Sequence, residues 1–124
     1  MATLNLTSTI NSTGLTSDSI ASNVLNSAQV TTGGISRMNI TALVGGTAQV
    51  VAAHADHAAG SYVYLKNAGS LNLSVKLEAG ANAIFNIYLT PGTWALFPWA
   101  ADNANITCYA SANTGCLLEH GVFA

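Results

Sequence analysis

The stretch Leu71-Asn-Leu-Ser-Val-Lys-Leu-Glu78 decides the fold, because apolar and polar residues alternate along its whole length. One set of alternate positions is apolar: Leu71, Leu73, Val75 and Leu77. The other set is polar: Asn72, Ser74, Lys76 and Glu78. Successive side chains of a β-strand point to opposite faces of a sheet. The alternation therefore predicts a strand with one dry face and one face in water.

Weaker segments of the same kind follow one another along the rest of the chain. After a strand-like stretch over 35–44, we expect strands at 47–53, 61–66, 71–78, 83–89, 93–97, 104–110 and 116–123. The segments between them are short and rich in Gly, Pro, Asn, Asp and Ser, which favour turns. Many short strands at a spacing of about ten residues are typical of sandwiches and jelly rolls. The sequence predicts an all-β fold over residues 33–124, an antiparallel β-sandwich or jelly roll of about eight strands.

Residues 1–32 differ in composition, because Thr, Ser and Asn dominate there. We interpret this zone as an extended N-terminal arm with one or two short strands. A helix over residues 18–28 is the alternative, since Ile20, Val24 and Ala28 would share one of its faces. The Ser and Asn residues inside that segment have modest helix propensity, which favours the extended arm.

Charge is scarce in this chain of 124 residues, which has three Lys and Arg residues, five Asp and Glu residues and a net charge of −2. Nucleic-acid binding requires several phosphate contacts, and anionic membrane surfaces attract clustered cations. Three scattered cations provide neither, so we expect no nucleic-acid partner and no membrane partner. The N-terminal residues lack the pattern of a secretory signal, and no apolar run is long enough for a membrane span. We therefore expect synthesis in a cytoplasm.

Cys108 and Cys116 bracket a predicted turn over residues 111–115. That turn would place the two residues opposite one another in a hairpin, so a cross-strand disulfide is geometrically conceivable. In a reducing cytoplasm two buried thiols are favoured over a bridge. We expect the buried thiols.

One cluster has metal-ligand chemistry: His54, Asp56 and His57. Two imidazoles and a carboxylate could supply three ligands to zinc or another divalent ion. The surrounding alanines and Gly60 instead favour a plain solvated loop. We expect no metal and no cofactor in this protein.

Catalytic motifs are missing from the sequence. There is no Gly-x-Ser-x-Gly nucleophile elbow and no glycine-rich phosphate loop before a helix. His120 lies beside Glu119, but nothing in the pattern completes a triad. We therefore expect that the protein is not an enzyme.

Four motifs in the second half of the chain carry a family resemblance. They are Tyr62-Val-Tyr-Leu-Lys-Asn67, Leu71-Asn-Leu-Ser-Val75, Leu89-Thr-Pro-Gly-Thr-Trp-Ala-Leu-Phe-Pro98 and Leu117-Leu-Glu-His-Gly121. From Ser61 onward the chain thereby resembles small virion proteins of tailed bacteriophages. The resemblance is one of strands and turns and covers about half of the chain.

Such phage proteins are typically β-sandwich modules that decorate capsids or build tail appendages, commonly as trimers. The resemblance implies a structural protein of the virion: a capsid decoration (cement) protein that binds the outer surface of the major capsid protein lattice and stabilises the head. It also implies a homotrimer at the capsid surface. A tail, neck or fibre component is one alternative. A carbohydrate-binding adhesion module, whose late aromatic residues contact a host glycan, is another.

Contacts with the capsid protein and with other copies would use apolar residues of the arm and aromatic residues of the late strands. When a partner covers a weakly charged surface, few charged groups lose their water, so the desolvation cost of such contacts is small. The interface candidates are Leu4, Leu6, Ile10, Tyr88, Trp94 and Trp99.

Overall fold

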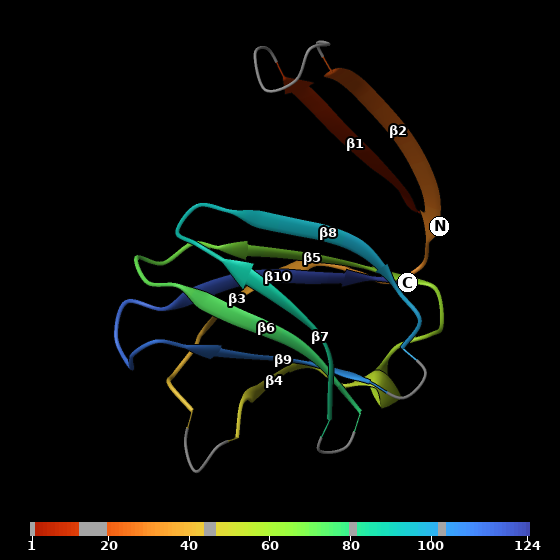
Figure 1. Ribbon diagram of the computed structural model, residues 1–124. Coiled ribbons are helices and arrows are strands. Elements are labelled where there is room, and N and C mark those ends of the chain that lie inside the picture. The colour runs from red at the N-terminus through yellow and green to blue at the C-terminus, as the bar shows by residue number, and fades with distance from the viewer. Residues whose placement is uncertain (1, 13–19, 44–46, 80–81, 102–103) are drawn as a thin grey trace. The chain divides into compact units, whose positions relative to one another are not determined.

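The computed structural model describes residues 2–12, 20–43, 47–79, 82–101 and 104–124 (Figure 1). The chain divides into two compact units, residues 1–31 and residues 32–124. The described residues of the larger unit form eight strands: β3 (Ile35–Asn39), β4 (Gln49–Ala52), β5 (Ser61–Asn67), β6 (Leu73–Ala79), β7 (Asn82–Leu89), β8 (Trp94–Trp99), β9 (Asn105–Ala110) and β10 (Leu117–Phe123). A short 3-10 turn, η1 (His54–Asp56), lies between β4 and β5.

The eight strands form two four-stranded antiparallel sheets, with strand orders β3-β10-β5-β8 and β4-β9-β6-β7. This confirms the predicted all-β sandwich. Each strand pairs with its counterpart counted from the other end of the unit: β3 with β10, β4 with β9, β5 with β8 and β6 with β7. The pattern is that of one long hairpin rolled up so that β10 also pairs with β5, and β9 with β6. Of the two folds that the sequence left open, the topology is that of a jelly roll.

The core lies between the two sheets and follows the alternation of the sequence. In β6, Leu73 and Val75 are fully buried, and Leu77 packs against the same core. Along β5 every second residue is buried, from Ser61 to Asn67. The alternation that predicts the strands therefore also predicts which side chains fill the core.

The predicted hairpin around residues 111–115 is wrong. β9 and β10 belong to opposite sheets, so the chain crosses from one sheet to the other between them. Cys108 and Cys116 are both free and buried, as expected of the thiols. Burial, reinforced by the neighbouring Cys116, raises the pKa of Cys108 to about 12. Turn residues signal a change of direction, but not whether the chain returns within the same sheet.

Residues 1–31 contain a two-stranded antiparallel ribbon made of β1 (Ala2–Ser12) and β2 (Ile20–Val30). Each strand is eleven residues long, so the expectation of short strands was wrong. The helical alternative is wrong for residues 20–28, which belong to β2. Local helix propensity there is weak, and a long partner strand satisfies the backbone instead.

The side chain of Asn67 connects the two sheets at the end of β5. It is fully buried, and its Nδ2 donates hydrogen bonds to the carbonyl oxygens of Leu71 (2.7 Å) and Leu89 (2.9 Å). Its Oδ1 accepts a hydrogen bond from the backbone N–H of Gly69 (3.0 Å). Leu89 ends β7, and Leu71 leads into β6, so an amide from one sheet satisfies carbonyls of the other.

A second polar contact fastens the edge strand β3 to its sheet. Arg37 Nε donates to Glu119 Oε2 (2.9 Å), and its Nη2 lies 2.8 Å from the same oxygen. The hydroxyl of Tyr64 donates to Glu119 Oε1 (3.0 Å). The Arg37 hydrogen bond, followed by that from Tyr64, lowers the pKa of Glu119 from its usual value. Because the three residues belong to β3, β5 and β10, the contact spans three adjacent strands.

Replacing Asn67 by Ala should lower the free energy of unfolding, because the carbonyls of Leu71 and Leu89 would lose their buried donor. Each orphaned carbonyl costs about 1–3 kcal/mol. Urea unfolding measures the loss. Asn86→Ala is the control, because Asn86 is exposed on β7, and its effect should stay within about 0.5 kcal/mol. Equal effects of the two substitutions would contradict the role of Asn67.

Acid should weaken the Glu119 contact. The folded pKa of Glu119 lies below its usual value of 4.5, so the stabilisation is present above pH 4.5 and is lost as pH falls through the folded pKa. We expect Glu119→Gln to remove this part of the acid sensitivity. Melting temperatures of both proteins, measured from neutral pH down to below 4.5, should converge at the acid end. Parallel pH profiles would contradict the prediction.

Candidate functional site

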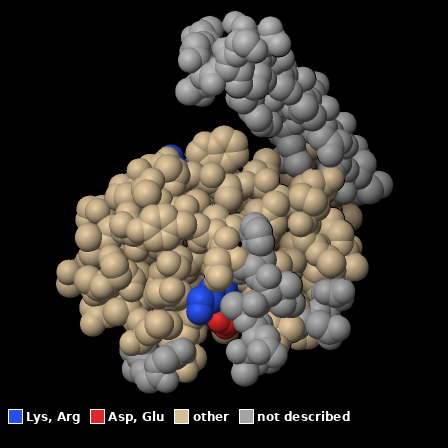
Figure 2. Space-filling model, viewed as in Figure 1, with Lys and Arg blue, Asp and Glu red and all other residues tan. Residues whose placement is uncertain are grey.

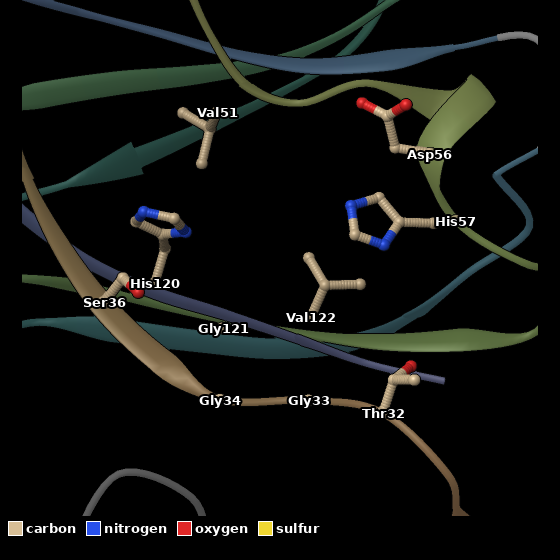
Figure 3. Close-up of a pocket in the computed structure, with 10 residues that line it drawn as sticks. All are labelled: Thr32, Gly33, Gly34, Ser36, Val51, Asp56, His57, His120, Gly121 and Val122. Atoms are coloured by element: carbon tan, nitrogen blue, oxygen red, sulfur yellow. The ribbon is translucent and has the colours of Figure 1, made fainter.

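A cavity of about 430 Å³ opens where the edge strands β3 and β4 border the sandwich. Ser36 from β3 and Val51 from β4 line two of its sides, and His120 and Val122 from β10 line its floor. Figure 3 shows the rings of His57 and His120 on opposite sides of the cavity, with Val122 between them. We call it the His57–His120 cavity.

Backbone also forms part of the wall, because residues 32–34 run beside β10. Thr32 and Ala124 exchange two backbone hydrogen bonds of 3.0 Å. Gly121 has no room for a side chain, since a Cβ there would lie 2.7 Å from the carbonyl oxygen of Gly34. The hydrogen bonds to Ala124 hold the start of the segment, and the glycine at 121 allows its backbone to lie directly against β10.

The segment that carries His57 is anchored at several points. The backbone N–H of His54 donates to Asn105 Oδ1 (3.0 Å), and Ser61 Oγ donates to the carbonyl oxygen of Ala58 (2.7 Å). The ring of His57 packs on that of Trp99, with centroids 5.6 Å apart and an interplanar angle of 57°. Most of the segment is solvated, as expected of a loop, because residues 55, 56 and 58–60 are exposed, but neighbouring strands supply anchoring partners that the local sequence does not reveal.

His120 occupies a position where the strand pattern calls for an apolar residue. It alternates in β10 with Leu118, which is fully buried, and with Val122, which packs against the core. Burial lowers the pKa of His120, so the imidazole is neutral at pH 7. The sequence interpretation missed this residue as a cavity group. The signal was present, since a lone polar residue breaks the apolar row of the last strand.

The three sequence-predicted metal candidates are not brought together. Asp56 and His57 line the cavity with His120, whereas His54 does not line it. Within the described residues, no set of three or more His, Cys, Asp or Glu side chains is arranged to hold a metal ion. The residue types alone suggested a shared ion, but only two of the three line the same cavity.

The aromatic interface candidates fall into two groups. Tyr88 and Trp94 are exposed, by 64 % and 55 %, whereas Trp99 is only 3 % exposed and belongs to the core. The expected interface role of Trp99 is therefore wrong. Trp99 follows Trp94 by five positions in β8, an odd offset, so the two side chains lie on opposite faces of the strand.

Large exposed apolar side chains concentrate on the edge strands. In the described part of the chain they are Ile35, Leu43, Val50, Tyr88 and Trp94. All except Leu43 lie on β3, β4, β7 or β8, the strands that end the two sheets. We call these four residues the edge residues.

The arm candidates share one face of the ribbon. Leu4, Leu6 and Ile10 occupy even-numbered positions of β1, which fall on one face of a strand. The register places Leu4 opposite Ala28 and Ile10 opposite Ser22, and residues directly opposite share a face. The even positions of β2 also include Ile20 and Val24. The odd positions of β1 are all polar: Thr3, Asn5, Thr7, Thr9 and Asn11.

Much of the charge on the larger unit is neutralised within it. Besides the Arg37–Glu119 pair, Lys76 Nζ lies 3.6 Å from Glu78 Oε1 and 5.1 Å from the centroid of the Tyr109 ring. In Figure 2 the charged atoms occupy only small patches of the visible face. No helix within the described ranges has the length and apolarity needed to cross a membrane.

Three features are thus candidates for function: the His57–His120 cavity, the edge residues and the apolar-rich face of the ribbon. Comparison of the chain with protein-family models, with curated proteins and with solved structures gives no match.

Proposed function

We propose that the chain is a structural virion protein of a tailed bacteriophage: a capsid decoration protein that binds the outer surface of the major capsid protein lattice and stabilises the head. The resemblance of the strand and turn motifs supports this assignment. So does the jelly roll, a fold used by viral capsid proteins among others. Fold alone does not establish function. The observation that carries the proposal is the set of exposed apolar residues on the free edges of the sheets.

An unprotected sheet edge favours association. Edge strands present unpaired backbone groups, and proteins that remain single usually cover these edges or place charged residues along them. Here the four edge residues are Ile35, Val50, Tyr88 and Trp94, and each is more than half exposed. A neighbouring chain could add a strand to such an edge or cover its apolar side chains. Repeated contacts of this kind suit a protein that covers a lattice.

Weak charge supports the same role. Because Arg37 and Lys76 already pair with Glu119 and Glu78, a neighbour that approaches closely strips few unpaired charges of water. Stable association requires burial of roughly 1,200–2,000 Å² per contact. Aromatic residues such as Tyr88 and Trp94 are typical anchors of interfaces of this size. We propose a homotrimer, in agreement with the phage proteins that the chain resembles.

The ribbon supplies the contact with the capsid in this proposal. A two-stranded ribbon by itself is marginally stable, because one pair of strands buries little apolar surface. The face that carries Leu4, Leu6 and Ile10 is apolar-rich, and the sole charged residue among the first thirty is Asp18. An apolar surface of the major capsid protein would complement this face. Binding would then stabilise the ribbon and hold the jelly roll on the head.

Deletion of residues 2–31 should leave the jelly roll folded but abolish its binding to heads. The cluster that forms the core begins at Ile40, and the hydrogen bonds between Thr32 and Ala124 remain in the shortened chain. Cosedimentation with purified heads that lack the protein measures binding. Thermal unfolding, followed by circular dichroism, checks that the shortened chain is folded.

Retained binding by the shortened chain would contradict the role of the ribbon. Mass spectrometry of intact virions tests the location independently. A decoration protein is present in a simple ratio to the major capsid protein. A few copies per virion would instead assign the chain to the tail, the neck or a fibre.

Trp94→Ala should weaken self-association without destabilising the fold, because Trp94 is exposed on an edge strand. We expect a loss of about 2 kcal/mol in association, as for an interface anchor. Trp99→Ala is the matched control: the buried ring should cost about 3–5 kcal/mol in unfolding free energy. Sedimentation equilibrium measures assembly and urea unfolding measures stability. Unchanged assembly of the Trp94 variant would contradict the proposed edge contact.

A further inference from the structure

We propose that the His57–His120 cavity binds a neutral, hydroxyl-rich ligand of about the size of a monosaccharide. This inference goes beyond the proposed role in the virion and stands independently of it. It also places carbohydrate binding away from the exposed aromatic residues that the sequence suggested.

The cavity has the size of a small-molecule site. Its volume of about 430 Å³ falls within the range of about 300–1,000 Å³ that is typical of ligand pockets. Its walls come from strands of both sheets, and the segment that carries His57 is anchored by Asn105, Ser61 and Trp99. The wall is therefore held in place before a ligand arrives, which reduces the entropy cost of binding.

Three polar side chains of the cavity wall make no hydrogen bond with the residues that the structure describes. Within the described part of the chain, the carboxylate of Asp56 and the rings of His57 and His120 make no hydrogen bonds to other residues. His57 and His120 are half-buried, and their ring nitrogens are not among the fully buried atoms that lack a partner, so water can bind them until a ligand replaces it. Figure 3 shows both imidazoles directed into the cavity. These are the groups that a bound ligand would satisfy.

His120 is the residue of the cavity that most clearly suggests a binding role, because an apolar residue would suit its place in the strand better. Leucine or valine at this position would continue the apolar row of Leu118 and Val122. A side chain that breaks a local rule of the fold is most often found at a functional site. A neutral imidazole has one donor and one acceptor nitrogen, so it can bind a hydroxyl group in either sense.

The chemistry of the wall excludes other ligand classes. Anions would meet the Asp56 carboxylate and neutral His120, and no Lys or Arg lines the described wall. Hydrocarbons would leave the imidazoles unpaired. A lone exposed carboxylate holds a cation weakly, and the described acidic, His and Cys residues form no metal group.

A sugar can make hydrogen bonds with the polar groups of the wall and also contact its apolar side chains. Its hydroxyl groups can donate to Asp56 and both donate to and accept from the imidazoles, while Ser36 and Thr32 offer further hydroxyls. Val51 and Val122 supply an apolar surface for the C–H groups of the sugar ring.

Titration of the full-length protein with simple sugars tests the proposal. The probes are the methyl glycosides of glucose, galactose, mannose and N-acetylglucosamine at millimolar concentrations. The readout is the NMR signal of each histidine ring. We expect at least one sugar to shift the signals of His57 and His120 in a saturable manner. His54 is an internal control, because it does not line the cavity and its signal should not follow the titration.

Two variants link the shifts to the cavity. Ser36→Trp places a large ring at the cavity from an exposed position of an edge strand and should abolish the sugar-induced shifts. Ser111→Trp is its matched control, because Ser111 is exposed and does not line the cavity. His120→Leu should weaken binding at least tenfold while the melting temperature stays equal or rises. Circular dichroism confirms that each variant is folded.

Three results would overturn the proposal. The first is no saturable shift with any of the four sugars. The second is a shift that persists in Ser36→Trp, because the sugar would then bind elsewhere. The third is a response of the same rings to zinc ions alone, with none to sugars, which would make the cavity a metal site.

Discussion

The buried amide of Asn67 is the interaction on which the larger unit depends. Two sheets that meet only through apolar side chains could slide on one another, since hydrophobic contact has no preferred direction. Hydrogen bonds do have direction, and those from Asn67 to Leu71 and Leu89 fix one sheet relative to the other. Its backbone completes the connection, because Asn67 N–H donates to Thr93 and its carbonyl accepts from Gly92, both at 2.9 Å. The end of β5 and the turn between β7 and β8 therefore form one joint.

The Asn67 joint also matters for the edge strands of the two sheets. A jelly roll does not close into a barrel, so each sheet ends in two edge strands, here β3 and β8 in one sheet and β4 and β7 in the other. Fixing the sheets also fixes the positions of these edges. Apolar side chains on a rigid edge lose little entropy when a partner covers them. The same residues would be a liability in a protein that stays alone in solution.

The sequence predicts those parts of the fold that depend on local alternation. The pattern around Leu73 and Val75 identifies both the strand and its buried face, because burial on one face imposes a period of two. The pairing of β10 with β3 and β5 leaves no such local trace, so the assumed hairpin around Cys108 and Cys116 was wrong. The cavity was hidden for the same reason, since His57 and His120 become neighbours only through the roll of the chain. His120 alone could have been found, as the polar residue in an apolar row.

The two proposed roles share one side of the sandwich, since Ile35 and Val50 lie next to cavity residues on β3 and β4, but contacts through β7 and β8 alone would not compete with the cavity. Ser36 of β3 and Val51 of β4 border the cavity, whereas Tyr88 and Trp94 lie on β7 and β8, which end the sheets on the other side. Assembly through β7 and β8 leaves the cavity open to small molecules. A decoration protein bound in many copies would then present many such cavities on one particle. Each cavity could bind a single sugar weakly. A particle with many linked cavities would bind a sugar-covered surface more tightly, because after the first contact the other cavities meet sugars at a high effective concentration.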